Sequence, residues 1–152
     1  MKKILAMCAI LCLPLSAMAS EAYTVLFKTQ GTFHDVRDSV QFAIEGKGLA
    51  INHTNKIAEM LARTGEAVGA SKQVYVDGEQ FEFCSATLSR EMMEADPHAM
   101  VMCPYIVSVY TIPDDKNVYI AYRKPGPTTN PKLQKALSDV ESLLTSIIED
   151  AM

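Results

Sequence analysis

The stretch YIVSVYTIPDDKNVYIAYR, residues 105–123, decides the fold class. β-Branched and aromatic residues fill its two ends, residues 105–112 and 118–123, and this composition is typical of β-strands. The polar residues 114–117 between them predict a tight turn. The stretch therefore predicts an antiparallel hairpin, which places at least one antiparallel sheet in the protein.

Other strands are expected on the N-terminal side of this hairpin. YTVLFKT, residues 23–29, has the same β-branched and aromatic composition. Residues 49–53 are a short apolar run that predicts a second strand. Asp77-Gly78 lies between residues 72–76 and 80–84. Asp-Gly between two such runs predicts a further hairpin, with one longer irregular strand as the alternative.

Amphipathic helices are expected between and after the strands. Residues 33–45 carry apolar side chains at helical spacing, and Thr32 and Asp35 have the spacing of a capping box. Asn55 is the expected N-cap of a helix that carries Ile57, Met60 and Leu61. Residues 89–94 predict a third helix.

Two proline-containing pairs mark further helix starts. Asp96-Pro97 and Asn130-Pro131 each place a capping residue before a proline at the first helical position. The helix after Asn130 has a regular apolar stripe, formed by Leu133, Leu137, Val140, Leu144, Ile147 and Ile148. Hairpins bounded by amphipathic helices predict an α+β fold with a single antiparallel sheet and helices packed on one face.

The N-terminus has the three parts of a secretory signal peptide. Lys2 and Lys3 precede an apolar run, residues 4–15, and Ala17-Met18-Ala19 matches an Ala-x-Ala cleavage pattern. The run is shorter than the roughly 20 residues that span a bilayer. We expect cleavage after Ala19, export to the periplasm or medium, and a single domain over residues 20–152.

The charge and the cysteine count of the mature chain follow from this cleavage. Losing Lys2 and Lys3 takes the net charge from −4 to −6. An acidic chain without a Lys/Arg cluster offers no electrostatic surface for nucleic acid or anionic lipid. Of four cysteines, Cys84 and Cys103 remain, and an even count in an oxidising compartment predicts a disulfide.

FCSATLSREMMEADPHAMVMCPYIVSVY, residues 83–110, is similar to the central segment of an uncharacterised bacterial family, the domain of unknown function numbered 302. Met92, Met93 and Pro97 occupy the helix of its K-L-M-x-x-x-P pattern, and Pro104 matches the step into its hydrophobic strand. Residues 31–36 (GTFHDV) resemble its first helix entry, and residues 118–122 (VYIAY) its last hairpin. The resemblance implies an α+β fold related to the TATA-box-binding-protein-like arrangement, often a homodimer, and no activity. The cysteine pair departs from the family pattern.

The cysteine pair is the first candidate site. Cys84 ends one expected strand and Cys103 precedes the next, so antiparallel pairing would bring the sulfurs near bridging distance. A structural disulfide closing a loop of about 20 residues would contribute about 3 kcal/mol to stability. The alternative is a thiol/disulfide or sulfur-handling redox pair, which needs a lowered thiol pKa or a strained disulfide.

Copper is a second alternative, because thiolate, thioether and imidazole are ligands that select Cu(I). Met92, Met102 and His98 lie in the same segment as the two cysteines. Methionines on short helices more often fill core gaps, so we expect no cofactor.

Arg123, Tyr105 and His98 are the candidate ligand-binding residues, since the Arg123-Lys124 pair could bind an anion beside a proline-rich loop. No nucleophile-elbow, zinc-protease or phosphate-loop motif occurs in the sequence. We therefore expect an exported, non-catalytic accessory module that binds a small ligand or an envelope protein.

Overall fold

The computed structural model describes residues 23–152, and the predicted signal peptide lies outside these residues. Five strands form one antiparallel sheet in the order β1-β5-β4-β3-β2. This sheet confirms the predicted fold class. The strands are β1 (Thr24–Thr29), β2 (Ile51–Asn55), β3 (Gly78–Phe83), β4 (Tyr105–Tyr110) and β5 (Val118–Arg123).

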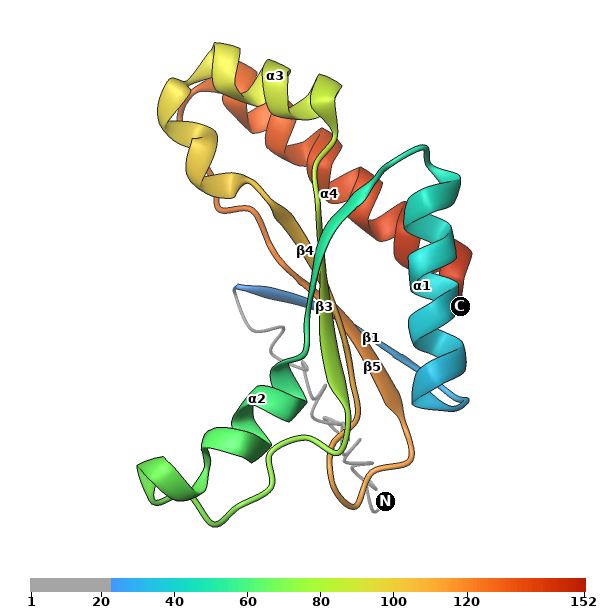
Figure 1. Cartoon of the computed structure of the whole chain (residues 1–152). Coiled ribbons are helices and arrows are strands. Elements are labelled where there is room, and N and C mark those ends of the chain that lie inside the picture. Colours follow the sequence, from blue (N-terminus) through green and yellow to red (C-terminus); the bar gives the residue numbers. More distant parts are fainter. Residues whose placement is uncertain (1–22) are drawn as a thin grey trace, which may run out of the picture.

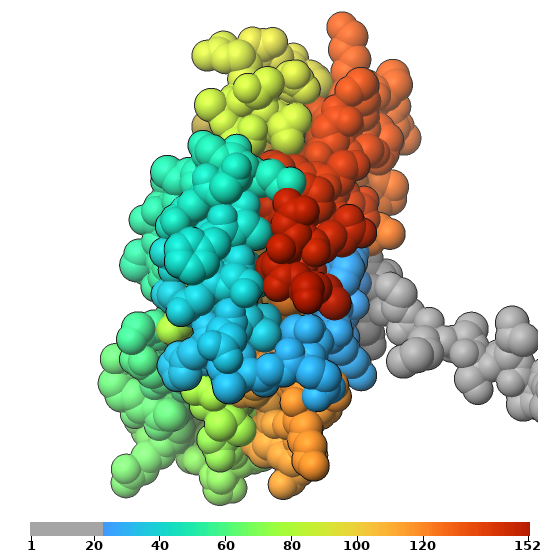
Figure 2. All heavy atoms as spheres, turned by 90° about the vertical axis from the view of Figure 1, so that its right-hand side faces the viewer, coloured from blue at the N-terminus to red at the C-terminus, as the bar shows by residue number. Residues whose placement is uncertain are grey.

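The helices divide unequally between the two faces of the sheet. They are α1 (Phe33–Gly46), α2 (Ile57–Thr64), α3 (Ala86–Ala95) and α4 (Pro131–Ala151), with short 3-10 helices η1 (Glu66–Val68) and η2 (Pro97–Met102). Figure 1 shows α1 and α4 on one side of the sheet and α2 on the other. Seen from that first side, α1 and α4 lie against each other and cover the sheet (Figure 2). Among residues 23–152, α2 is the helix that borders the opposite face, where it lies against β3.

The core lies between the sheet and the α1–α4 layer. Alternate residues of β4, namely Tyr105, Val107 and Val109, are buried, as expected when one face of a strand packs on helices. The whole predicted stripe of α4 is buried as well. Phe81 and Phe83 of β3 are fully buried and supply the largest side chains of this core.

Capping residues fix where α1 and α4 begin. The Thr32 hydroxyl accepts a hydrogen bond from the Asp35 backbone N–H at 3.1 Å. The Asn130 side chain accepts from the backbone N–H groups of Lys132 and Leu133 at 3.1 and 3.2 Å. Both caps match the sequence prediction, since each satisfies a backbone donor that the first turn leaves free.

The predicted hairpin around Asp77-Gly78 is wrong. Residues 72–76 form no strand, and β3 begins at Gly78 and pairs with β2 and β4. A two-residue hairpin needs left-handed residues in its turn, but neither Asp77 nor Gly78 has a positive φ. Asp77 is bound to β4's end instead, because its backbone N–H donates to the Thr111 hydroxyl at 3.1 Å.

The second strand and second helix begin later than predicted. β2 covers Ile51–Asn55 rather than residues 49–53, and Lys56, which makes no capping bond through its side chain, precedes α2. Asn55 is not the cap, because it pairs in β2 and its amide donates to the Glu82 carboxylate of β3. In residues 23–152, no helix is both long and apolar enough to cross a membrane.

Candidate functional site

The two cysteines lie at adjoining strand ends. Cys84 directly follows β3, and Cys103 precedes β4 with Pro104 between them. Phe83 pairs with Tyr105 in the antiparallel ladder, so the excursion through α3 and η2 returns the chain to its starting point. Both thiols are free and half-buried.

The electrostatic environment of this pair keeps Cys84 protonated. Burial raises the pKa of the Cys84 thiol, and the neighbouring Cys103 raises it further through its charge and through a side-chain hydrogen bond. Because Phe83 pairs with Tyr105, the two thiols lie at adjoining strand ends. A thiol whose pKa is raised holds little nucleophilic thiolate at neutral pH.

Ser89 of α3 connects the cysteine pair to β4. Its Oγ lies 3.2 Å from the Cys103 Sγ and 3.2 Å from the Tyr105 Oη. Tyr105 is buried, and burial is the main reason that its pKa is raised. The pair is therefore bordered by neutral hydroxyl groups, and the nearby Glu82 carboxylate raises the pKa of Cys84 rather than lowering it.

The residues predicted as copper ligands do not share one environment. Met92 is fully buried in the core, Met102 is half-buried, and His98 is exposed on η2. Within residues 23–152, no group of three or more His, Cys, Asp or Glu side chains is placed to hold a metal ion.

The predicted ligand-binding residues are likewise separated. Val107 pairs with Tyr122, and both belong to the core face. Because side chains alternate along a strand, Tyr105 shares that face while Arg123 points to the open face. His98 lies on η2, outside the sheet.

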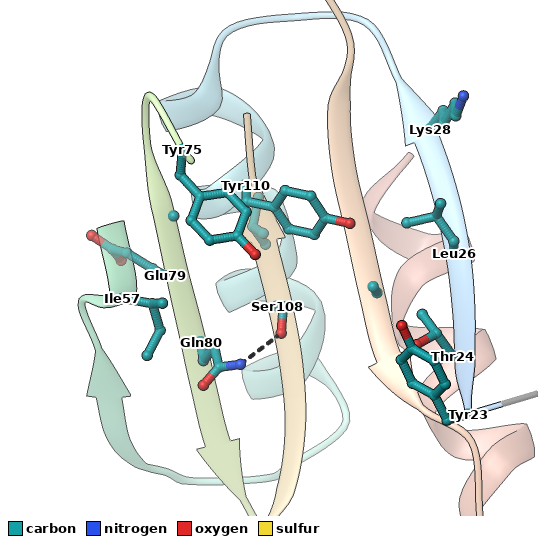
Figure 3. Close-up of a pocket in the computed structure, with 13 residues that line it drawn as sticks. Tyr23, Thr24, Leu26, Lys28, Ile57, Tyr75, Glu79, Gln80, Ser108 and Tyr110 are labelled. Carbon is teal, nitrogen blue, oxygen red and sulfur yellow. Dashed lines mark hydrogen bonds between the residues drawn. The ribbon is translucent and has the colours of Figure 1, made fainter. Parts of the chain in front are cut away.

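A cleft of about 890 Å³ lies on the open face of the sheet (Figure 3). Its floor crosses three strands, because Gln80 of β3 pairs with Ser108 of β4, and Ser108 pairs with Ala121 of β5. These are short or slender side chains, so the sheet is hollowed where they meet. The cleft is lined by Tyr23, Thr24, Leu26, Lys28, Ile57, Tyr75, Gly78, Glu79, Gln80, Ser108, Val109, Tyr110 and Ala121.

Gly78 lets α2 close one side of the cleft. A Cβ atom at Gly78 would lie 3.5 Å from the Cβ atoms of both Ala58 and Tyr110. This spacing is ordinary van der Waals contact, so a methyl group would fill the space and a larger side chain would displace α2 or Tyr110. The neighbouring Ile57 of α2 consequently reaches the cleft.

Tyrosines form a continuous aromatic row at one end of the cleft. The Tyr75 and Tyr110 rings meet edge-to-face, with centroids 5.3 Å apart and planes at 69°. Tyr110 stacks on Tyr119 at 5.3 Å and 11°, and the Lys28 ammonium lies 5.3 Å from the Tyr119 ring centre. Burial raises the pKa of Tyr110, and the nearby Tyr75 and Tyr23 add to the shift, so this hydroxyl stays a hydrogen-bond donor.

The floor of the cleft is polar but uncharged. The Gln80 amide donates to the Ser108 hydroxyl at 3.1 Å across β3 and β4, as the dashed line in Figure 3 shows. Glu79 also borders the cleft, but its carboxylate accepts from Arg37 of α1 at 2.9 Å. Figure 3 shows the Glu79 side chain directed away from the tyrosines.

Sequence comparison identifies the family. Residues 25–151 match the family described as domain of unknown function DUF302. The chain belongs to the DUF302 family. The resemblance read from residues 31–36 and 83–110 is thus confirmed at the level of the family.

A solved DUF302 structure shares the fold. The crystal structure of the uncharacterized conserved protein DUF302 from Bacillus stearothermophilus superposes with a TM-score of 0.72 at 13% sequence identity. The match covers 87% of this chain and 100% of that chain. At this identity the similarity shows the DUF302 fold alone. No curated protein matches the sequence.

The cleft of this DUF302 domain was missed by sequence reasoning. Part of the signal was present, since Ser108 and Ala121 interrupt strands whose other residues are mostly bulky or apolar. Alternation places each on the face opposite the core. Their side-by-side position with Gln80, however, depends on the register of three strands, which no local pattern specifies.

Proposed function

We propose that this DUF302 protein is an exported, non-catalytic module that binds a small molecule in the open-face cleft. The cleft itself carries the proposal. Its volume of about 890 Å³ falls within the roughly 300–1,000 Å³ of small-molecule sites. Aromatic walls and a few polar groups that converge on the floor are the usual composition of such sites.

The chemistry of the lining favours binding over catalysis. Among the described residues that line the cleft there is no histidine or cysteine, and the carboxylate of Glu79, a type that can act as a general base, is paired with Arg37. The Gln80 amide and Ser108 hydroxyl bond to each other. Neutral groups of this kind orient a ligand without changing it.

Export places the module in the cell envelope or outside the cell. The positive residues, short apolar run and Ala17-Met18-Ala19 pattern support cleavage by signal peptidase. In that compartment we propose that Cys84 and Cys103 form a structural disulfide. Each thiol loses a proton and the pair gives two electrons to the disulfide of an envelope dithiol oxidase, which is reduced to a dithiol.

The redox and copper alternatives receive less support. An exchanging thiol needs a lowered pKa, whereas burial and Cys103 raise the pKa of Cys84. A copper site would have to use the two thiols without Met92, which is fully buried. Elemental analysis of protein purified from the envelope under reducing conditions tests copper directly, and stoichiometric copper would overturn the structural role of the pair.

A homodimer is the expected assembly. The family resemblance implies it, and α2 buries none of its residues. Met60, Leu61 and Val68 of α2 and η1 are exposed apolar side chains, which a second copy would cover. Sedimentation equilibrium of the mature protein tests this, and a monomer at all concentrations would contradict it.

The binding proposal is tested by nuclear magnetic resonance of the mature protein with a library of neutral and charged fragments. We expect amide shift changes to cluster at Gln80, Ser108 and Ala121. Ser108→Leu should fill the floor and abolish the changes. Ser138→Leu, at an exposed position of α4, is the matched control and should leave them intact. Fragments that never perturb the cleft would overturn the proposal.

A further inference from the structure

We infer that the ligand of the open-face cleft is a short, neutral oligosaccharide, with a sugar ring stacked on the tyrosines and its hydroxyls bonded to Gln80 and Ser108. This inference rests on the proposed binding function and names its ligand class. It is carried by the combination of aromatic rings at the sides of the cleft with an uncharged polar floor.

The tyrosine rings offer surfaces that suit a sugar face. Tyr75 and Tyr110 are half-buried and Tyr23 is 65% exposed. Figure 3 places Tyr75 and Tyr110 at one side of the cleft and Tyr23 at the other. An aromatic face carries negative potential, and the C–H groups of a pyranose face are weakly positive. Stacking a sugar between these sides would bury apolar surface on both partners.

Gln80 and Ser108 on the floor of the cleft can bond the hydroxyls at the edge of the stacked sugar ring. Gln80 uses one amide N–H to bond Ser108, which leaves its second N–H and its carbonyl oxygen, while Ser108 keeps its hydroxyl proton. Neighbouring hydroxyls of a sugar both donate and accept, so they can pair with an amide beside a hydroxyl. An apolar ligand would leave the second Gln80 N–H, its carbonyl oxygen and the Ser108 hydroxyl proton without partners.

The charges around the cleft are already engaged, which favours a neutral ligand. The Lys28 ammonium lies over the Tyr119 ring, and the Glu79 carboxylate pairs with Arg37.

The size of the cleft favours more than one sugar unit. A volume of about 890 Å³ is near the upper end of the range for small-molecule sites. The cleft also stays open along the sheet, from Tyr75 at one side to Tyr23 at the other (Figure 3). A chain of linked rings can therefore extend past the tyrosines.

The test is titration calorimetry of the mature protein with neutral gluco-, manno- and N-acetylglucosamine oligosaccharides. Choline and a short fatty acid are the comparison probes. We expect saturable binding to at least one saccharide series. Tyr75→Leu should weaken it about tenfold or more, which is about 1.4 kcal/mol, because it removes the ring on which the sugar stacks. Tyr75→Phe keeps the ring and should retain most of the affinity.

These titrations distinguish the saccharide as ligand from the binding function of the cleft, on which it rests. Binding of choline or the fatty acid but of no saccharide would overturn the inference and leave a ligand-binding cleft. Saccharide binding that neither Tyr75→Leu nor Ser108→Leu weakens lies elsewhere on the protein and would also overturn it. If none of these probes binds and no fragment shifts the amide signals of the cleft, both the saccharide ligand and the binding function are contradicted.

Discussion

The side-chain amide of Asn130 donates a 3.0 Å hydrogen bond to the backbone carbonyl of Ala95. Asn130 is the N-cap of α4 and Ala95 is the last residue of α3. One side chain thus satisfies two donors at the start of one helix and a carbonyl at the end of another. The bond fixes α3, and with it the cysteine pair, to the helical layer.

Replacing Asn130 should therefore lower the stability of the protein by more than the loss of one helix N-cap does. Asn130→Ala leaves two N–H groups and one carbonyl without partners, and we expect the free energy of unfolding to fall by about 1–3 kcal/mol in urea titrations. Asn130→Ser keeps a good cap but is too short to reach Ala95, so its loss should be smaller. Thr32→Ala, which removes only the α1 cap, is the control. Equal losses for Asn130→Ala and Asn130→Ser would contradict the bridging role.

Oxidation of the cysteine pair should stabilise the protein. A disulfide between Cys84 and Cys103 closes a loop of about 20 residues, which contributes about 3 kcal/mol by restricting the unfolded chain. We expect the denaturation midpoint of the oxidised protein to fall on adding reductant. The double variant Cys84→Ser/Cys103→Ser should match the reduced protein and ignore the reductant. A wild-type protein that is equally stable with and without reductant would exclude the structural disulfide.

Local patterns were sufficient for the elements that form the core. The α4 stripe was predicted because its periodicity reflects burial on one face, and the two strands at residues 105–112 and 118–123 because of their β-branched and aromatic composition. The Asp77-Gly78 turn was misread for a physical reason. Its backbone is fixed by tertiary bonds to Thr111, and these outweigh the local turn preference.

The candidate sites were predictable to different degrees. Cys84 and Cys103 could be placed together because antiparallel strands return the chain to its start. The cleft could not be placed, since it needs Gln80, Ser108 and Ala121 in register on three strands and α2 against Gly78. Arg123 and Tyr105 were both candidate ligand-binding residues, but alternation along the strands places them on opposite faces of the sheet.

Gly78 should tolerate one methyl group and no more. A Cβ atom there would meet Ala58 and Tyr110 at 3.5 Å, so Gly78→Ala should leave stability within about 1 kcal/mol of wild type. Gly78→Val adds two methyl groups where no space remains, and should push α2 outward and cost about 1–3 kcal/mol. Thermal unfolding measures the cost, and amide shifts of Ile57 and Tyr110 report the displacement. Gly126→Val, where nothing lies within 4 Å, is the control.

The raised pKa of Cys84 should be visible in its reactivity. The pKa lies above its ordinary value of 9.0, chiefly through burial and then through Cys103. In protein reduced by a phosphine, iodoacetamide labelling of Cys84 should therefore reach half its maximal rate above pH 9.0. Cys103→Ser removes the contribution of Cys103 but not that of burial, so the pH of half-maximal labelling should move towards 9.0. Labelling that is already fast at neutral pH would contradict the assignment and favour a redox role.

The same shift makes the reduced protein sensitive to alkali. Because the folded state has the higher pKa, the unfolded state loses the Cys84 proton first as the pH rises. The stabilising contribution is complete below the ordinary thiol pKa of 9.0 and is lost as the pH passes through the raised value. In urea titrations, the free energy of unfolding of the reduced wild type should thus fall more steeply above pH 9.0 than that of Cys84→Ser. The oxidised protein has no thiol to ionise at position 84, so its stability should depend on pH as that of Cys84→Ser does. If the free energy of unfolding of Cys84→Ser fell as steeply as that of reduced wild type, another group would be the cause.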